Sequence, residues 1–358
     1  MVMQASTTSS PALTEPGFRD DTPGCLPVPR VGVPVHANVT VQGRLAALAQ
    51  RNGAEQPFAL AMAGFPGGTL ELKQARAVID HQAAEASLAR LALAYLNHEE
   101  AGAVPPPEQT RVIAEALRQF EQIGGACARL ELTGPVSLAL QVVDDHERPL
   151  AYDLPLREAL CQHTILRANW YFNQLKGVPG LPMVCFDEPF LDALSSPLCP
   201  LDWEAGTDML MRTLGELPPT RALCVAGVPN WAAVLALPAE VVFFDAYEHS
   251  AGLIQAASAV AGYLDRGGML GWGIVPHDEH ALGHENAATL VQRFELTVAY
   301  LSAAGGINAN KIYASALIST SGRLCHLPSD RAAYAAQLCA EVATKLRSVH
   351  FLEATTST

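Results

Sequence analysis

Short apolar runs alternate with long stretches in which apolar residues recur at helical spacing along most of this sequence. Each run is four to six residues long, which is typical of strands buried on both faces. We predict eight strands, at 31–35, 58–63, 128–132, 181–186, 222–226, 241–244, 269–274 and 312–317.

The longer stretches predict helices between these strands. In the last of them, Ala335, Cys339, Val342 and Leu346 fall on one face, as expected for a helix that packs on a core. Ser329, directly after a proline, indicates where that helix starts. The predicted helices are 70–97, 107–123, 156–175, 204–217, 251–265, 285–304 and 329–347.

Strands that alternate with helices favour parallel pairing through right-handed crossovers, and eight strands suggest a closed (β/α)8 TIM barrel. An open doubly wound sheet is the competing architecture, but no G-x-G-x-x-G follows the first strand and no Walker A motif occurs. No internal repeat or Gly/Ser-rich linker divides the chain. We therefore expect a polar, disordered tail over 1–26 and one barrel domain over 27–358.

The composition indicates which kinds of ligand or partner the protein can bind. The 358 residues carry a net charge of −13, and no run of Lys or Arg is longer than a pair, which argues against binding to nucleic acid or to an anionic membrane. Eight scattered cysteines without a C-x-x-C, together with no signal-like or membrane-length apolar segment, predict a cytoplasmic protein with reduced thiols. A small molecule is the expected ligand.

Polar side chains gather where the predicted strands end. In a parallel barrel these ends form one rim, where active sites lie. The stretch VCFDEPFL ends a buried strand on Asp187 and Glu188, either of which could instead cap the next segment or pair with an Arg. The other strand ends contribute His36, Trp231, Asp245, Tyr247, His277 and Ser321.

Several of these residues also have purely structural interpretations. His277, His280 and His284 have metal-like spacing, but the preceding proline and Gly283 argue against one regular helix through all three. Trp231 and Tyr247 could stack on a flat ligand or simply cover the core. No G-x-S-x-G occurs, so a serine nucleophile of that type has no support.

Five phrases in order, LELTGPVSLAL, CFDEPFL, VVFFDAYE, RGGMLGWGIVP and LISTSGRL, resemble the C-terminal domain of cobalamin-independent methionine synthase, within the uroporphyrinogen decarboxylase and methionine synthase superfamily. The resemblance implies a (β/α)8 barrel in which Asp187 holds the amino group of an amino-acid thiol. It also implies a zinc ion that lowers the pKa of the bound thiol, so that the thiolate attacks a methyl donor.

The expected zinc ligands are mostly missing. Where the family has a His-x-Cys pair after the fifth strand, this chain has Cys224 and Ala226, or Leu223 and Val225 in the alternative register. Ser321 replaces the last Cys, and the first-strand signature keeps at most His36. Asp245 alone remains as an acidic ligand, and one Asp with one Cys cannot make a zinc site. A zinc site formed instead by His277, His36 and Cys325 is the remaining way in which the chain could bind the metal.

Two hypotheses therefore stand. The first is a methyltransferase-like enzyme in which Asp187 binds an ammonium group, Asp245 orients the substrate or binds a metal, and His277 or His36 carries a proton. The second is a metal-free barrel, either decarboxylase-like or a ligand-binding or partner subunit without catalysis. Arg323 is the only Arg at a predicted strand end, which disfavours a polyanionic substrate. The superfamily resemblance also makes a homodimer a reasonable expectation.

Overall fold

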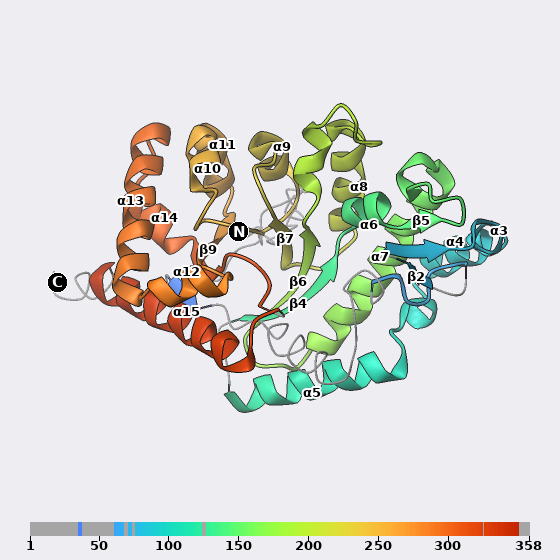
Figure 1. Ribbon diagram of the computed structural model, residues 1–358, viewed down its shortest axis with the longest axis horizontal. Coiled ribbons are helices and arrows are strands. Elements are labelled where there is room, and N and C mark those ends of the chain that lie inside the picture. Colours follow the sequence, from blue (N-terminus) through green and yellow to red (C-terminus); the bar gives the residue numbers. More distant parts are fainter. Residues whose placement is uncertain are drawn as a thin grey trace, which may run out of the picture.

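A computed structural model describes residues 35–37, 61–67, 71–73, 76–123, 127–324 and 326–350. The predicted tail over 1–26, the side chain of His36, and Cys325 lie outside the described residues. The fold is α/β, with a curled parallel sheet at its centre (Figure 1).

The central sheet has seven strands, all parallel, in the order β1-β10-β9-β8-β7-β6-β4. Apart from β1, neighbours in the sheet follow the chain, as right-handed βαβ crossovers require. The first strand pairs with the last, Val35 lying opposite Ala316. The strands are β1 (Val35–Ala37), β4 (Cys127–Thr133), β6 (Leu181–Glu188), β7 (Arg221–Val225), β8 (Val241–Phe244), β9 (Met269–Val275) and β10 (Ala316–Thr320).

Helices connect these strands and cover the outer face of the sheet. Successive helices pack side by side in the order α7, α8, α9, α11, α13 and α15 (Figure 1). None of the helices in the described part of the chain is long and apolar enough to span a membrane. Their bounds are α5 (Pro107–Ile123), α6 (Pro135–Gln141), α7 (Leu154–Leu175), α8 (Trp203–Gly215), α9 (Trp231–Ala236), α10 (Ser250–Gln255), α11 (Ala257–Asp265), α12 (Glu279–His284), α13 (Ala287–Gly305), α14 (Ala309–Ala314) and α15 (Ser329–His350).

A second, small sheet lies outside the central one. Strand β2 (Glu71–Lys73) pairs antiparallel with β3 (Arg76–Ile79), which pairs parallel with β5 (Val143–Asp144). Two short helices follow, α3 (His81–Glu85) and α4 (Leu88–Leu96), and Asp80 caps the first by accepting a hydrogen bond from the Ala83 N–H. The prediction of one helix over 70–97 is therefore wrong in its first third, because pairing with the distant β5 overrides the local pattern.

Strand β6 shows how the two faces of the central sheet differ. Val184 and Phe186 belong to the large core under the helices, whereas Met183 and Cys185 belong to a small separate cluster on the opposite, inner face. This alternation follows from the two-residue period of a strand. Continued to the end of β6, it places Asp187 on the inner face and Glu188 on the helix-covered face.

Most predicted elements are confirmed with small shifts of their ends. Strand β8 and helix α5 match the predicted ranges, and the predicted helix 251–265 is divided at Ala256 into α10 and α11. The predicted strand 312–317 starts late, since Ile312 lies in α14. Within the predicted strand 58–63, Ala61 and Met62 are helical and the first three residues lie outside the described part.

Candidate functional site

Asp187 and Glu188 end β6 with opposite surroundings. Both Glu188 carboxylate oxygens turn towards the start of α6, where they accept hydrogen bonds from the N–H groups of Val136 (3.0 Å) and Ser137 (2.7 Å). Burial raises the pKa of the Glu188 carboxyl to about 7, although hydrogen bonds from Ser137 and Val136 lower it. Glu188 thus caps a helix, which is the structural alternative for this residue, and we leave it out of the proposed ligand contacts.

Asp187 instead forms an ion pair with Arg323, which lies in the loop after β10. The Asp187 side chain is 11% exposed and the Arg323 side chain 29% exposed. In the sheet β6 and β10 are separated by β7, β8 and β9, so the arginine reaches across the mouth of the curled sheet. This pair brings two distant strand ends together at one rim.

A second ion pair lies on the same inner face. Arg129 and Glu131 of β4 bind each other with side chains only 6% and 7% exposed, and the Arg129 guanidinium lies 4.1 Å from the centre of the Phe243 ring. Burial raises the pKa of Glu131, with opposing effects from Arg129 and Arg323 and a further increase from Asp187. The two ion pairs therefore form one electrostatic group of zero net charge.

Arg129 and Glu131 are functional candidates that the sequence analysis missed. Their signal was present, because two opposite charges two residues apart inside an apolar strand must face the same side of the sheet. Arg323 was noted only as a cation at a strand end. Its partner could not be identified from sequence, since the pair joins the fourth and eighth predicted strands.

His277 and Ser321 are brought together as the rim hypothesis expects. The Ser321 Oγ lies 2.8 Å from the His277 Nδ1 and accepts a hydrogen bond of 3.1 Å from the His277 backbone N–H. The imidazole packs on Gly322, where an added Cβ would lie 2.9 Å from the ring. An imidazole held beside a hydroxyl can serve as a general acid or base.

Asp245 lies on the same rim as Ser321. Gly273 of β9 fits between them, because a Cβ there would lie 2.6 Å from the Phe244 carbonyl oxygen and 2.7 Å from the Ser321 Cα. The Asp245 carboxylate accepts a hydrogen bond of 2.9 Å from the Glu248 N–H, and burial raises its pKa. Asp245, Glu248 and His249 offer ligand atoms within 4.8 Å of one another, which is the spacing a divalent cation needs.

The other predicted contacts point elsewhere. Trp231 is buried and packs edge-to-face against Phe244, which agrees with a side chain that covers the core. The Tyr247 hydroxyl donates a hydrogen bond of 2.9 Å to Glu285, and the Arg293 guanidinium lies 4.3 Å from the centre of its ring. Both aromatic residues therefore have packing partners. The backbone of His36 lies in β1 opposite Leu317, and its side chain is outside the described residues.

The three-histidine metal hypothesis does not match the geometry. Helix α12 begins at Glu279, after His277, and Asp278 caps it. His280 and His284 are exposed on this helix with ring centres 4.7 Å apart, whereas the His277 Nδ1 faces Ser321. The three imidazoles therefore do not share one ligand position.

The residues at the zinc positions that the sequence resemblance implies do not fit a zinc ion. The Cys224 thiol faces the inner side beside Asp187, and burial raises its pKa well above the ordinary value, which favours a neutral thiol. Leu223 and Val225 are core residues, and Ala226 carries no ligand atom. The Ser321 hydroxyl is already bonded to His277. These positions therefore offer no set of protein ligands for a zinc ion that would bind the substrate thiolate.

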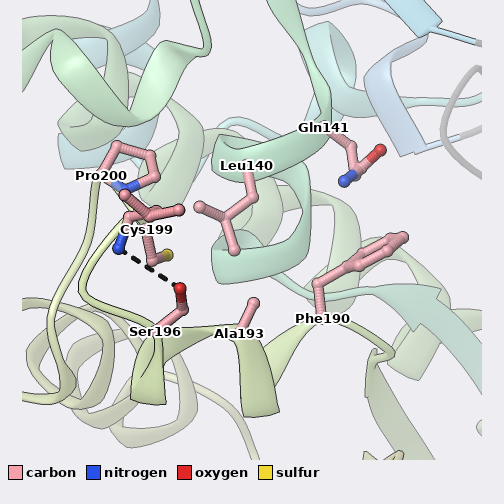
Figure 2. A pocket seen from close by; sticks show the side chains of 8 residues that line it. Leu140, Gln141, Phe190, Ala193, Ser196, Cys199 and Pro200 are labelled. Atoms are coloured by element: carbon pink, nitrogen blue, oxygen red, sulfur yellow. Dashed lines mark hydrogen bonds between the residues drawn. The ribbon is translucent and has the colours of Figure 1, made fainter.

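A shallow apolar hollow of about 260 Å³ lies beside the segment that follows β6 (Figure 2). It is formed by the end of α6 and the segment around η3 (Leu191–Ser195). Its lining includes Leu140, Phe190 and Cys199, and the Cys199 N–H donates a hydrogen bond of 3.0 Å to the Ser196 carbonyl oxygen. Since none of its lining residues is charged, the hollow does not supply the groups that an amino acid would need, and we place the candidate site at Asp187.

No protein-family model and no curated protein matches the sequence. Among solved structures, a B12-independent methionine synthase from a Shewanella species, in complex with selenomethionine, is 12% identical with a TM-score of 0.46, and the match covers 66% of each chain. A methyltransferase from Methanosarcina mazei is 13% identical with a TM-score of 0.49, over 86% of this chain and 94% of that one. The first is the kind of protein that the sequence phrases resemble.

Proposed function

We propose that the rim binds a small amino-acid thiol and that the chain is a methyltransferase-like barrel of the methionine synthase type. The observation that carries this proposal is Asp187, a nearly buried carboxylate on the inner face at the end of a central strand. A carboxylate in this position is suited to a substrate ammonium group, because low solvent exposure strengthens a charge-assisted hydrogen bond.

We also infer that the sheet closes into the eight-stranded barrel predicted from the sequence. Two observations support this inference. The strands that are described follow the barrel order, and β1 pairs with β10 as the first and last strands of a closed barrel do. The structure describes seven of these strands, and residues 38–60 lie outside the described part of the chain.

The proton chemistry of this site would differ from that of a zinc enzyme. A free thiol with a pKa near 8.5 is only a few per cent ionised at pH 7, so a zinc-free site needs another proton acceptor. His277, in the loop after β9, and Ser321, in the same loop as Arg323, supply a candidate. In this scheme the substrate S–H proton passes to the His277 imidazole as the sulfur attacks the methyl carbon. The demethylated donor leaves with the electron pair of its former bond to that carbon.

A ligand-binding subunit without catalysis is the second candidate function. It is favoured by the loss of the zinc ligands, which removes the family's means of activating a thiol. A decarboxylase-like site for a polyanion has less support, because Arg323 is engaged by Asp187 and Arg129 by Glu131. The predicted homodimer remains a prediction under each function.

Calorimetric titration with L-homocysteine tests the binding proposal. We expect binding by the wild-type protein and a loss of roughly 10- to 100-fold in affinity in Asp187→Asn, which removes one charged partner. Asp265→Asn is the control, because Asp265 is 73% exposed and pairs with Lys311. No binding by the wild type, or equal binding by Asp187→Asn, would contradict the proposal.

A methylation assay separates the two candidate functions. Homocysteine is incubated with an N-methyl pterin, a methyl corrinoid or a methyl sulfonium compound, and methionine is measured by mass spectrometry. Turnover that falls at least about 100-fold in His277→Gln with unchanged homocysteine binding supports the enzyme. Binding without methionine from any donor supports the non-catalytic subunit. Zinc content of protein purified without chelator is measured on the same sample.

A further inference from the structure

The partner of Asp187 is the least expected part of the rim. A binding carboxylate does not need a permanent arginine, yet Arg323 reaches it from the loop after β10. The arginine side chain is more exposed than the aspartate, at 29% against 11%. Of the two partners, Arg323 is therefore the one that a ligand can reach more easily from solvent.

The charges around the pair of Asp187 and Arg323 restrict which ligands can take the place of this ion pair. Arg129 and Glu131 lie nearly buried on the same inner face, and Glu131 is influenced by both Asp187 and Arg323. The four groups sum to zero charge. A ligand that brought a net charge would leave one of the four without compensation in a poorly solvated place, which is costly.

A zwitterion meets this condition, because it carries both charges on one carbon. We infer that Arg323 binds the α-carboxylate of the amino acid whose ammonium group is bound by Asp187, so that the rim selects zwitterions. This inference rests on the proposed function. On binding, the ligand enters between the two side chains and exchanges one ion pair for two, with no change in net charge. The guanidinium suits this role because it can bind a carboxylate with two parallel N–H groups.

The structure offers a contrasting role for Arg323, that of a fixed counter-ion for Asp187. The two roles differ in ligand selectivity. A fixed counter-ion would have to be displaced by an amine and by an amino acid alike, and would distinguish neither. A carboxylate-binding arginine favours the amino acid, and its removal frees Asp187 for the amine.

Three related thiols test the inference by calorimetric titration. L-Homocysteine carries both charges, 3-aminopropanethiol lacks the carboxylate, and 4-mercaptobutanoate lacks the amine. We expect wild-type protein to prefer homocysteine to each of the others by at least about 10-fold, the range of one charge-assisted hydrogen bond. In Arg323→Gln, homocysteine affinity falls roughly 10- to 100-fold, whereas 3-aminopropanethiol binds at least as tightly as to the wild type.

Two further variants test whether a change in ligand preference comes from the geometry of Arg323. Arg323→Lys keeps the charge next to Asp187 but not the two-pronged geometry, so it should fold and should show an intermediate preference. Arg331→Gln is the matched control, since Arg331 lies at 3.6 Å from Glu279 in a well-exposed pair outside the site. Circular dichroism and the thermal midpoint verify the fold of each variant.

The outcomes separate the two proposals. If Arg323→Gln and Arg323→Lys keep the wild-type preference for homocysteine, the carboxylate role of Arg323 is overturned while ammonium binding by Asp187 stands. If wild-type protein binds homocysteine and 3-aminopropanethiol equally, the selection of zwitterions is likewise overturned. If wild-type protein binds none of the three thiols, the proposed function fails first and the inference fails with it.

Discussion

At the scale of single residues, adjacent carboxylates on one strand have different tasks because a strand alternates its faces. Asp187 faces the inner side with Arg323, and Glu188 faces the helices and caps α6. The two-residue period predicts that Asp187 and Glu188 face opposite sides of the sheet, but the pair DE alone does not establish the assignment of sides. It becomes visible only once Met183 and Val184 are seen to belong to different clusters.

Glu188 predicts a specific dependence of stability on pH. Burial raises its folded pKa to about 7 from an ordinary 4.5, so the folded state retains the proton that the unfolded chain has already lost. Its contribution to stability is therefore fully present below about pH 4.5 and is lost as the pH rises through 7. Relative to Glu188→Gln, the wild type should lose ~3 kcal/mol of unfolding free energy between pH 4.5 and pH 8.

Urea unfolding of both proteins at the two pH values measures this difference. The comparison must be made between variants, because burial lowers the pKa of His163 to about 3 and its contribution changes with pH in the opposite sense. Glu204→Gln, at an exposed site, serves as control and should change stability by less than about 0.5 kcal/mol at either pH. A stability difference between wild type and Glu188→Gln that is independent of pH would refute the assigned cause.

At the scale of elements, the junction between β4 and α6 depends on a glycine. An added Cβ at Gly134 would lie 2.2 Å from the Glu188 Oε1 and 2.6 Å from its carboxyl carbon. The capping carboxylate needs that space to reach the N–H groups of Val136 and Ser137. The helix cap that follows thus requires a residue without a Cβ at this position.

Gly134→Ala should therefore destabilise the protein by about 1–3 kcal/mol, since the new methyl group displaces a buried cap. The matched control is Gly215→Ala at the end of α8, where a Cβ would have no neighbour within 4 Å. The control should be neutral or slightly stabilising, by under about 1 kcal/mol. Thermal and urea unfolding of both variants give the comparison, and equal effects would argue against the steric explanation.

The sequence predicts the features that depend on local residue patterns and misses those that depend on contacts between distant parts of the chain. Buried parallel strands such as β8 are predicted well because their apolar runs have no alternative interpretation. Strands β2 and β3 are missed because their order comes from pairing with each other and with β5, far along the chain. At the site, Asp187, His277 and Ser321 follow from strand ends alone. The links from Asp187 to Arg323 and from Arg129 to Glu131 depend on tertiary geometry.

At the scale of the whole molecule, the inner face of the sheet is charged as well as apolar. Arg129 and Glu131 lie next to a cluster that includes Cys185 and Phe243. Buried pairs of this kind contribute little net stability when complete, but the loss of one partner leaves an uncompensated charge. The centre of the fold is therefore more sensitive to single than to paired substitution.

Arg129→Met and Glu131→Gln should each cost about 3–5 kcal/mol of unfolding free energy, and the double variant should cost clearly less than the sum. The reason is that the second substitution removes the charge that the first leaves buried. Urea midpoints of the four proteins give the coupling energy. Additive effects would mean that the two side chains do not compensate each other in the folded state.

The pairing of Val35 in β1 with Ala316 in β10 has a consequence for biosynthesis. The sheet cannot join its first and last strands until the chain through β10 has left the ribosome. Before then, β1 and β9 each present an open edge on which another chain could pair. A nascent chain stopped before Ala316 should therefore bind chaperones and aggregate, whereas one released after α15 should not.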